Sequence, residues 1–544
     1  MNSKNHHQMT QGQLKDCDVL IIGAGPVGLT SAAELIRQGI NFQIIDQRLE
    51  PEIKSTGTAI NPPTLEVFEP FGIVPELMNY GSQGNELQIQ NESPILKFSF
   101  QSEFKKYTKY PVSFGIEQWF TERTLNNYLL QNQHSIIRGI KIIDLKDEKE
   151  YVTVDYVDVN DTDETVYQIK VKYIIAADGA KSNTRKRLGI KYEGVSNTRT
   201  SAVAHFEAEP IEIPDNTQIV SFHQQGGYFL LKMPKGYATC IPLLESEEQE
   251  WISDELDSHG NQIPLPIADH YFEKLFAKRG LKVKVKNIIW KAHFRPNNRV
   301  ASNYSNKNRI FLIGDAVHSS DPMAGLGLNY GVQDAANLTW KIAFVVKGLA
   351  HHGILDSYEI EMKPYGELVV KSGISSGVNA LPVSSTHDFI RSHYLKFASD
   401  YKLATKGILN LYNMDKQYNS KLTRFVPGPC SIQRLRYQFI TKLEAGQKFP
   451  SSLFDHLTDS KSFIQTTGFK LLIFNLNQQP QQMEQMQHIK GITFTQIINS
   501  FETELVEHCG VLGDCILLIR PDNFVGLRSH SLDMSIVLDY MNAL

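Results

Sequence analysis

An apolar stretch near the N-terminus changes its period and predicts a strand, a tight turn, a helix and a second strand. Asp18–Ile22 is a short run rich in β-branched residues, which is typical of a parallel strand buried on both faces. Apolar residues then recur at helical spacing between residues 27 and 36, and Gly39 ends this helix. A second apolar run, Phe42–Ile45, follows. The pattern therefore predicts a β-α-β unit within an α/β fold.

Glycines fill the turn between this first strand and its helix in the pattern GxGxxG. Gly23 allows the tight turn, Gly25 lets the backbone approach a pyrophosphate, and Gly28 lets the helix pack closely on the strand. The N–H groups at the start of the helix then face the phosphates. Asp46 ends the second strand about 20 residues on, where a carboxylate accepts hydrogen bonds from a ribose. The stretch predicts a dinucleotide site with candidates Gly23, Gly25, Pro26, Val27, Gly28, Asp46, Gln47 and Arg48.

A second strand-turn-helix motif lies in the middle of the chain. Two alternating strands, Tyr151–Val159 and Val166–Val171, form a hairpin pattern, and a separate apolar strand, Tyr173–Ala177, follows them. Asp178-Gly179 then forms a turn, and Arg185 falls in the first turns of the next helix. By itself this motif predicts a strand-turn-helix with a surface arginine.

A third motif is more specific than the second. Arg309–Ile313 is an apolar strand that ends in Gly314-Asp315, and a glycine-rich loop, Pro322–Asn329, leads into the long helix Gly331–Val346. A carboxylate at the end of a strand can bind a polyol, and glycine backbone can approach a flat ring closely. The motif therefore predicts a second part of the same ligand site.

The rest of the chain divides by pattern into a sheet region, a helical region and a last α/β region. Residues 195–289 predict a sheet with Gly226-Gly227 as a turn and with strands Ser201–Glu207, Gln218–His223, Tyr228–Met233 and Tyr237–Pro242. Residues 355–445 are largely helical in pattern. From about residue 448, Gly468–Phe474 and Cys515–Asp522 predict buried strands, and residues 531–544 predict a final helix.

Length and composition predict a multidomain protein of a reducing compartment. A chain of 544 residues is too long for one hydrophobic core, so two or three domains are expected. A net charge of −4 gives no reason to expect nucleic acid as a partner, and no apolar run approaches the roughly 20 residues of a membrane span. The polar N-terminus is not a secretory signal, and five scattered cysteines favour a cytoplasmic location. No cluster has metal-ligand spacing, so no metal is expected.

The three motifs, in this order and at these separations, resemble the flavoprotein aromatic hydroxylases of the para-hydroxybenzoate hydroxylase type, over roughly residues 16–350. The resemblance implies that the chain binds FAD and uses NAD(P)H as a co-substrate. The first motif would hold the adenosine and pyrophosphate of FAD, and Asp315 the ribityl chain. The family's DGAxSxxR element, associated with FAD and the nicotinamide cofactor, matches Asp178, Gly179, Ala180, Ser182 and Arg185. The resemblance also assigns to FAD the residues Gln118, Gly314, Pro322, Gly325, Gly327, Leu328 and Asn329.

The resemblance further implies how the chain is divided. A discontinuous, Rossmann-like FAD-binding domain would comprise residues 1–80, 110–190 and 290–400, and residues 81–109 and 191–289 would form an inserted β-sheet substrate domain. Residues 401–447 would be a helical connector. Residues 448–544 resemble the thioredoxin-like C-terminal domain of larger phenol and polyketide hydroxylases. This segment has no CxxC pair, so no redox activity is expected from it.

In the family, the inserted sheet covers the flavin ring and lines the substrate pocket. Gln225, Tyr228 and Pro322 are therefore candidates for substrate contact, and His205, His223, Tyr228 and His318 are candidates for a catalytic role. The alternative for each of these side chains is a hydrogen bond that only stabilises the fold. The sequence leaves the catalytic base unassigned.

The implied reaction is the hydroxylation of an aromatic substrate by a monooxygenase. In the family, reduced flavin and O2 give a C4a-hydroperoxide, whose distal oxygen is transferred to an electron-rich carbon. Ser201–Glu207 and Gln218–Met233 contain no arginine that could hold a carboxylate, which favours a phenol or a fused-ring polyphenol over a benzoate. The expected partners are thus a small aromatic molecule and O2. The sequence leaves a homodimer, and the choice between NADH and NADPH, open.

Two other functions stay open at this point. One is a related flavin halogenase or reductase, although the four tryptophans, Trp119, Trp251, Trp290 and Trp340, exclude the Trp-x-Trp signature of a halogenase. The other is a flavin-binding protein with a structural or sensing role. Three departures from the family pattern keep this alternative open. Thr56 and Pro63 stand about where many members carry arginines, and Ala324 replaces a usual glycine. The segment Glu361–Pro364 stands where the family has Glu-Arg-Arg-Pro.

Overall fold

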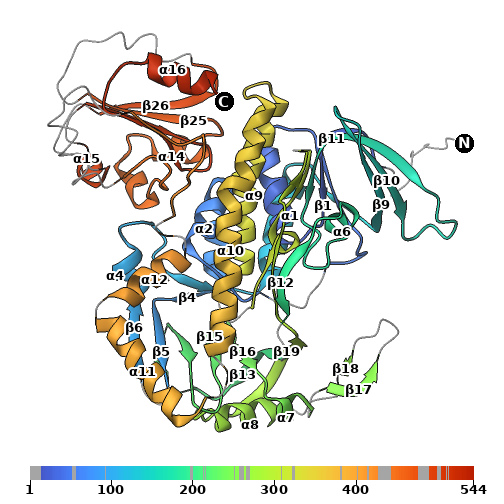
Figure 1. Cartoon of the computed structure of the whole chain (residues 1–544), viewed down its shortest axis with the longest axis vertical. Coiled ribbons are helices and arrows are strands. Elements are labelled where there is room, and N and C mark those ends of the chain that lie inside the picture. The colour runs from blue at the N-terminus through green and yellow to red at the C-terminus, as the bar shows by residue number, and fades with distance from the viewer. Residues whose placement is uncertain are drawn as a thin grey trace, which may run out of the picture.

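The fold was obtained as a computed structural model of the whole chain, shown in Figure 1. It describes all residues except 1–13, 52–56, 92–93, 197–199, 212, 215, 250–251, 257–261, 265–269, 308, 322–324, 380, 382, 401, 413, 415, 427–442, 476–488, 499–503, 510 and 512–513. Three sheets carry most of the architecture, and two long helices lie between them.

The first sheet contains the predicted β-α-β unit. Its central strands pair in parallel in the order β2 (Phe42–Asp46), β1 (Cys17–Ile22), β11 (Tyr167–Ala176) and β22 (Ile310–Leu312). The remaining strands are β8 (Ile136–Arg138), β9 (Ile140–Asp147), β10 (Val152–Asp158) and β21 (Ser305–Asn306). Helices α1 (Pro26–Arg37) and α9 (Gly327–Val346) pack against each other beside these strands. The predicted α/β class with a parallel sheet is therefore confirmed.

One strand of this sheet is longer than expected. The predicted strands Val166–Val171 and Tyr173–Ala177 form a single strand, β11, which pairs antiparallel with β10 at its start and parallel with β1 from Val171 onward. The hairpin and the second motif therefore share one rigid element. Because the carboxyl ends of parallel strands meet at one edge, β11 brings the Asp178-Gly179 turn beside the GxGxxG turn.

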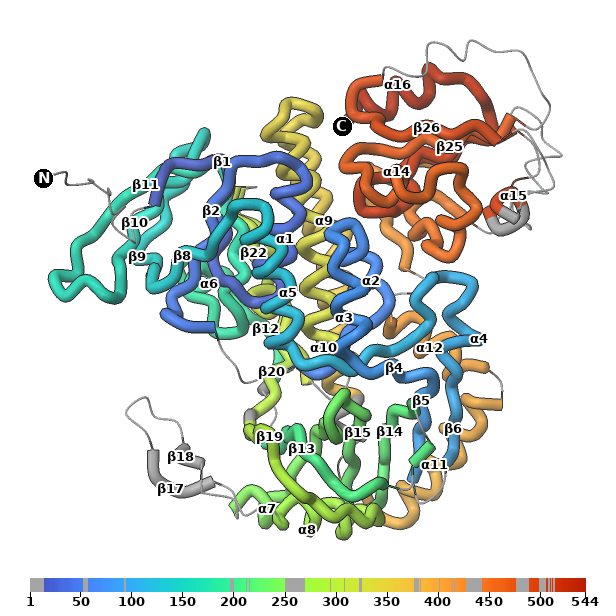
Figure 2. The backbone as a smooth tube through the Cα atoms, turned by 180° about the vertical axis from the view of Figure 1, so that it is seen from behind, coloured from blue at the N-terminus to red at the C-terminus, as the bar shows by residue number. Residues whose placement is uncertain are grey.

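The second sheet lies below the first in Figures 1 and 2. Its strand order is β19 (Val285–Phe294), β13 (Ser201–Ala208), β16 (Tyr237–Pro242), β15 (Tyr228–Lys232), β14 (Thr217–Ser221), β5 (Glu86–Gln90) and β6 (Pro94–Ser99). All four strands predicted within residues 195–289 belong to it. Helix α8 (His270–Lys278) covers one face through an apolar cluster that includes Phe206, Phe272 and Phe276. The proposed limits of the substrate domain stay a prediction, although β5 and β6 bring residues 86–99 into this sheet.

Short elements connect these sheets. Those of the first half are β3 (Ala59–Ile60), α2 (Pro62–Phe68), α3 (Val74–Tyr80), β4 (Ser82–Gly84), α4 (Phe100–Phe104), β7 (Ser113–Gly115), α5 (Gln118–Gln131), α6 (Asn183–Arg187) and β12 (Tyr192–Ser196). Those further on are α7 (Glu245–Gln249), β17 (Ile252–Leu256), β18 (Gln262–Pro264), β20 (Asn297–Ala301), η2 (Gly314–Ala316), β23 (His318–Ser319), α10 (Asp356–Asn379), α11 (Ser385–Asp400) and α12 (Leu403–Leu411).

The C-terminal region forms a mixed five-stranded sheet. Its order is β24 (Arg424–Val426), β28 (Val525–Ser529), β27 (Cys515–Ile519), β25 (Phe469–Phe474) and β26 (Ile492–Ile498), with helices α14 (Ser460–Gln465), α15 (Glu504–Cys509) and α16 (Ser535–Asn542). Both predicted buried strands and the final helix are present. The sheet is compatible with a thioredoxin-like unit, and that assignment stays a prediction.

The C-terminal sheet is packed firmly against the long helices. Trp340 and Phe344 of α9 contact Phe469 of β25 edge to face, with ring centroids 5.7 and 5.8 Å apart. Beside this apolar contact, the fully buried Arg520 binds Glu361 of α10 through both carboxylate oxygens, at 2.6 and 2.9 Å. The last region is therefore joined to the rest of the chain by a buried interface that combines aromatic and charged groups.

No helix in the described part of the chain is both long and apolar enough to cross a membrane. The described residues also contain no group of three or more histidine, cysteine or acidic side chains that could hold a metal ion.

Candidate active site

The GxGxxG turn separates two structural glycines from one that faces open space. Gly23 has a φ of +104°, and a Cβ on it would overlap the carbonyl oxygen of Ala177. A Cβ on Gly28 would overlap the carbonyl oxygen of Gly23. A Cβ on Gly25, by contrast, would meet no atom of the described residues within 4 Å. Among the three glycines of this turn, only Gly25 therefore borders a space, free of described atoms, that a ligand can fill.

Asp46 lies at the carboxyl end of β2, beside this turn. Its carboxylate accepts hydrogen bonds from the backbone N–H of Ala24 at 2.9 Å and of Arg48 at 2.8 Å, and the Arg48 guanidinium is 3.2 Å away. Burial by itself would raise the pKa of Asp46, but the bonds from Arg48 and Ala24 outweigh it and lower the pKa. Asp46 is thus an ionised acceptor at neutral pH, and the exposed Gln47 and Arg48 flank it.

The second motif supplies a turn and a buried arginine. Gly179 has a φ of +77° and, like Gly25, faces space free of other described atoms. One carboxylate oxygen of Asp178 accepts the N–H of Thr184 at 3.0 Å, and the other is buried with no hydrogen-bond partner among the described residues. A buried acceptor of this kind is suited to a donor from a ligand.

Arg185 differs from the surface arginine expected from the local pattern. Its side chain is buried, donates to the carbonyl oxygens of Ala316 and Ala180 at 2.9 Å each, and lies 3.7 Å from the ring centroid of Tyr192. The Arg185 guanidinium thus donates to one carbonyl oxygen of the second motif, that of Ala180, and to one beside the third, that of Ala316. Arg185 therefore joins the two motifs. Its predicted contact with FAD is not visible in this geometry.

In the third motif, a buried carboxylate orders the turn. Asp334 of α9 accepts the N–H of Gly314 at 2.9 Å and contacts Nε2 of His318 at 2.8 Å. Burial would lower the pKa of His318, but the charge and hydrogen bond of Asp334 outweigh it and raise the pKa. His318 is fully buried, which favours the structural alternative over a catalytic role. Asp315, in contrast, lies in η2 just after β22 and is exposed.

The glycine-rich loop meets the start of α9 beside two earlier segments. Pro322 lies outside the described residues, and Gly325 borders open space among the described atoms. Asn329 donates to the carbonyl oxygens of Gly325 and Ala59 at 2.9 and 3.2 Å, and it accepts the hydroxyl of Thr64 at 2.7 Å. Asn329 therefore fixes Gly325 and Ala59 beside the start of α9 with an amide that is already hydrogen-bonded.

Gln118 lies next to this loop, at the start of α5. Its side-chain oxygen accepts the N–H of Gly57 at 3.1 Å, and its nitrogen donates to Glu122 at 2.8 Å. A Cβ on Gly57 would lie 3.0 Å from that oxygen and 3.4 Å from Leu328. The predicted FAD residues Gln118 and Leu328 are thus brought together, with Gly327 at the first turn of α9.

The candidate cofactor residues follow one edge of the parallel sheet. Because the strand order is β2, β1, β11 and β22, this edge presents in turn the Asp46 carboxylate, Gly25, Asp178-Gly179 and Asp315. An extended dinucleotide needs a ribose acceptor, a bare backbone for the pyrophosphate and an acceptor for the polyol in such a row. The space beside Gly25, Gly179 and Gly325, which holds no other described atom within 4 Å of a Cβ built there, is compatible with FAD along this edge. We call this edge the groove at the strand ends.

The pocket candidates of the second sheet have different surroundings. His205 is buried, with Nδ1 2.9 Å from Glu117 and Nε2 against the carbonyl oxygen of Lys235, so it connects β13 to the segment before α5. His223 is half-buried and accepts the N–H of the exposed Gln225 at 3.1 Å. His223 and Gln225 thus lie in the turn before β15, whereas His205 serves the fold.

Tyr228 lies on the face of the sheet that α8 covers. Its ring packs edge-on against Phe276 with centroids 5.5 Å apart, and its hydroxyl accepts Nε2 of Gln90 at 3.2 Å. The opposite face carries Phe229, and Leu231 on that face packs against Ala59 of the first region. The position of Tyr228 therefore disagrees with its predicted substrate contact, because alternate residues of a strand point to opposite faces.

The residues that line the opposite face were missed in the sequence. Val203, Cys240, Phe229 and Trp290 form a small apolar cluster there. Trp290, on β19, is only half-buried. Alternate residues of a strand point to opposite faces. Once Tyr228 is known to face α8, this alternation along β13 and β15 places Val203 and Phe229 on the other face.

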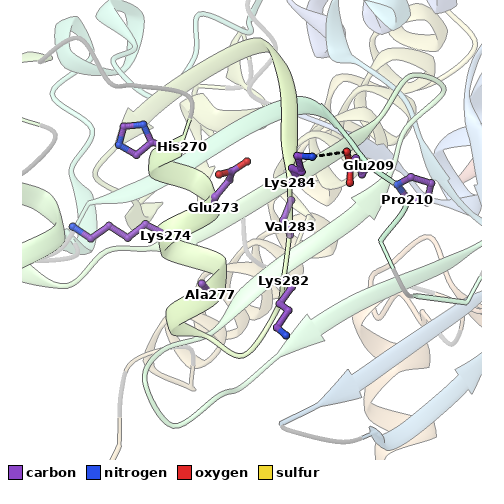
Figure 3. Close-up of a pocket in the computed structure, with 9 residues that line it drawn as sticks. All are labelled: Glu209, Pro210, His270, Glu273, Lys274, Ala277, Lys282, Val283 and Lys284. Atoms are coloured by element: carbon purple, nitrogen blue, oxygen red, sulfur yellow. Dashed lines mark ion pairs between the residues drawn. The ribbon is translucent and has the colours of Figure 1, made fainter.

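A separate surface depression of about 570 Å³ lies beside α8 (Figure 3). Its wall is mostly charged, and on one side of it Lys284 pairs with Glu209 at 2.9 Å. The remaining lining residues are Pro210, His270, Glu273, Lys274, Ala277, Lys282 and Val283. It contains none of the motif residues, so it is distinct from the groove at the strand ends.

Comparison with known proteins identifies the family. Residues 16–372 match the family model described as FAD binding domain. The FAD-dependent monooxygenase ankC of Aspergillus thermomutatus is 28% identical over 65% of this chain and 61% of its own length. The pentachlorophenol 4-monooxygenase of Sphingobium chlorophenolicum is 27% identical over 70% of this chain and 66% of its own length. The chain thus spans about two thirds of the length of these curated relatives.

The same fold is seen in a solved structure. The flavin-dependent monooxygenase PieE, solved with FAD and substrate, matches with a TM-score of 0.73 and 18% identity, over 97% of this chain and 99% of that one. The match of fold therefore includes the C-terminal region. The chain belongs to the FAD binding domain family, and its predicted resemblance to FAD-dependent aromatic hydroxylases is confirmed.

Proposed function

We propose that the chain is an FAD-dependent monooxygenase that uses NAD(P)H and O2 to hydroxylate a phenolic or polycyclic aromatic substrate. The observation that carries the proposal is the row of Asp46, Gly25 and Asp315 along one sheet edge, within the family match. When bound, FAD supplies the activation of O2 and the transfer of one oxygen atom. The protein binds the cofactor, orients the aromatic ring and excludes water.

Each end of the groove has a defined task in this proposal. Asp46 would accept hydrogen bonds from the ribose, and the first N–H groups of α1 beside Gly25 would bind the pyrophosphate. Asp315 would bind the ribityl chain, and the backbone from Gly325 to Asn329 would flank the flavin ring. Arg185 and Asn329 support these groups through backbone contacts.

An aromatic substrate is supported by the sheet face opposite α8. That face presents Phe229, Val203 and Trp290, and none of β13, β14 and β15 contains an arginine. A related protein named pentachlorophenol 4-monooxygenase takes its name from a phenol. An apolar wall without an arginine suits a neutral or phenolate ring better than a benzoate.

The proposed partners are the aromatic substrate, O2 and a nicotinamide cofactor. We also propose a cytoplasmic location, which the free state of Cys17, Cys240, Cys509 and Cys515 supports. The proposed groove is formed by residues of one chain, so the proposed function does not require a second chain and is compatible with a homodimer.

The first experiment is to purify the protein and test it for bound flavin and for NAD(P)H-driven oxygen consumption. We expect a yellow protein that releases FAD on denaturation and consumes oxygen faster when a phenol is present. A protein that holds FAD but never oxidises NAD(P)H would support the structural or sensing alternative. Chloride-dependent product halogenation would support a halogenase.

Asp315→Ala should weaken FAD binding. Loss of one charge-assisted hydrogen bond removes about 1.5–3 kcal/mol, or roughly ten- to one-hundred-fold in Kd. Titration of apoprotein with FAD, followed by flavin fluorescence, measures the change. Asp315→Asn keeps an acceptor oxygen and should lose less. Equal affinity in all three proteins would remove Asp315 from the ribityl site.

Cys509→Ala combined with Cys515→Ala should leave NAD(P)H turnover unchanged. Both thiols are fully buried, and burial raises the pKa of Cys509 to about 12 and that of Cys515 to about 11. Such thiols are protonated at neutral pH and unreactive as nucleophiles. A large loss of turnover, with an unchanged melting temperature, would instead indicate a redox role for the C-terminal region.

A further inference from the structure

A lysine that the proposed function does not use is buried among aromatic rings. Lys416 lies in the segment between α12 and β24 and is only 3% exposed. Its Nζ atom lies 4.2, 4.8 and 5.8 Å from the ring centroids of Tyr365, Tyr418 and Phe524. None of the described acidic side chains forms an ion pair with it. A buried lysine is normally paired with a carboxylate, whereas here the faces of aromatic rings attract the cation. We call these three rings the aromatic cage of Lys416.

The aromatic cage joins three parts of the chain. Tyr365 belongs to α10, Tyr418 to the segment between α12 and β24, and Phe524 to the turn before β28 in the C-terminal region. The rings of Tyr418 and Phe524 are stacked with centroids 4.0 Å apart, and the Arg520 guanidinium lies 5.0 Å from the centroid of the Tyr418 ring. Because rings from three parts of the chain pack around it, the Lys416 side chain has little freedom to move.

Lys416 also contacts the start of α9. Its Nζ atom lies 3.5 Å from the side-chain oxygen of Gln333, in the second turn of this helix. Gln333 in turn donates its side-chain N–H to the backbone carbonyl oxygen of Asn329 at 3.3 Å. The side-chain amide of Asn329 donates to the carbonyl oxygens of Gly325 and Ala59. A continuous row of contacts therefore leads from Lys416 to the glycine-rich loop of the third motif.

We propose that Lys416 is a positioning residue of the FAD site, which acts through Gln333 on the first turn of α9. This role rests on the proposed function, in which the loop before α9 belongs to the FAD site. The N-terminal end of a helix carries positive potential, and a cation beside its first turns adds to that potential. FAD is an anion, so both effects favour its binding. The C-terminal region, through Phe524, would thereby support cofactor binding without any redox chemistry of its own.

The charge of Lys416 changes near neutral pH. Burial lowers the pKa of Lys416 to about 7, and the nearby Lys448 acts in the same direction. The carboxylates of Asp334 on α9, Glu361 on α10 and Asp522 in the C-terminal region oppose this shift. The side chain is therefore a cation below about pH 7 and becomes neutral above it. Because a bound anion favours the charged form, FAD affinity should be highest below about pH 7 and should fall as the pH rises above it.

The test is the affinity of the full-length apoprotein for FAD, measured by flavin fluorescence between about pH 6 and about pH 9. Lys416→Met removes the charge and the N–H groups, and it should bind FAD roughly ten-fold more weakly at about pH 6, with no change near neutral pH. Lys416→Gln keeps an N–H donor for Gln333 without the charge, so it should lose less affinity and also show no change near neutral pH. Wild-type affinity that is independent of pH, or wild-type affinity in Lys416→Met, would overturn the proposal.

Lys470→Met is the matched control. Lys470 of β25 is also buried, and burial lowers its pKa to about 7, but its amine donates to Asn523 at 2.7 Å within the C-terminal region. A general effect of replacing a buried lysine should appear in the melting temperatures of both variants, whereas FAD affinity and its pH dependence should change only in Lys416→Met.

Three outcomes separate this role from the proposed function. An equal loss of FAD affinity in Lys470→Met would overturn the role of Lys416 and leave the FAD site in place. If Lys416→Met does not fold, Lys416→Gln and the wild-type pH profile decide the question, and an unchanged pH profile in Lys416→Gln would overturn the role. A wild-type protein that binds no FAD at any pH would overturn the proposed function, and the role of Lys416 with it.

Discussion

The Gly25→Val variant should fold normally and purify without FAD. A side chain on Gly25 would extend into space that contains no described atom within 4 Å, so the fold itself tolerates it. The same space is where the backbone must approach the pyrophosphate, and a valine there would exclude the cofactor. Absorbance at the flavin wavelengths and a melting curve, measured on the same preparation, test both parts of the prediction.

Gly28→Val is the matched control, three residues further along the same turn. Its Cβ would overlap the carbonyl oxygen of Gly23, so this substitution should damage the packing of α1 on β1 and lower the yield of folded protein. The pair thus separates loss of ligand from loss of fold. Wild-type FAD content in folded Gly25→Val would show that the groove is not the FAD site.

The second large effect is expected from Glu361→Gln, at the buried interface between α10 and the C-terminal sheet. The Glu361 carboxylate is fully buried and binds Arg520 at 2.6 and 2.9 Å and Lys341 at 2.8 Å. The substitution removes the negative charge of Glu361 and leaves the positive charges of Arg520 and Lys341 without it in the buried network. This should lower the free energy of unfolding by about 3–5 kcal/mol. Urea denaturation followed by tryptophan fluorescence measures it, because Trp340 lies at this interface.

The pH dependence of this interface follows from the same carboxylate. Burial would raise the pKa of Glu361, but Arg520 and Lys341 outweigh it and hold the pKa far below its usual range. Its stabilising contribution is therefore complete above the unfolded pKa of about 4.3 and is lost as the pH falls further. The wild-type protein should lose this stability in acid, whereas Glu361→Gln should lack that part of the pH dependence.

Glu367→Gln is the control for this prediction. Glu367 lies on the same helix, its side chain is 45% exposed, and its carboxylate is 4.0 Å from the Lys371 ammonium group. An exposed pair of this kind contributes under about 1 kcal/mol, so the variant should unfold near the wild-type midpoint. Equal stability of the Glu361 and Glu367 variants would contradict the role of the buried network.

The parts of the fold that depend on local pattern were predictable. The GxGxxG turn, the glycine and acid at the end of each later strand, and the four strands within residues 195–289 all follow from short-range periodicity and turn residues. These signals are local because a strand or a turn is selected by neighbouring side chains.

The parts that depend on tertiary contact were not predictable in the same way. Arg185 has the position of a cofactor residue in its motif, yet its guanidinium binds the carbonyl oxygen of Ala316, 131 positions later. Tyr228 was a pocket candidate because the family's sheet lines the pocket, yet its ring packs on Phe276 of α8. The sequence of β15 alone does not show which of its two faces α8 covers. Glu361 begins a segment that looked like a degraded Glu-Arg-Arg-Pro motif, and only the fold shows that Arg520 is one of its partners.

The division into domains and the thioredoxin-like assignment are likewise not decided by pattern. Helix α11 packs on β6 of the second sheet rather than on the first, although residues 290–400 were expected to belong to the FAD-binding domain. A sequence can therefore predict that a helix forms without predicting what covers it.

The most direct test of the proposed function is the amount of hydroxylated product formed per NAD(P)H consumed, compared across simple benzoates, simple phenols and polycyclic phenols. The apolar sheet face with Phe229 and Trp290, whose strands β13, β14 and β15 contain no arginine, predicts efficient coupling with phenols or polycyclic phenols and uncoupled oxidation with benzoates. Efficient coupling with a benzoate alone would contradict the assignment of the pocket. Coupling with no aromatic compound, while an isolated ketone or alkene is oxygenated, would contradict aromatic hydroxylation itself.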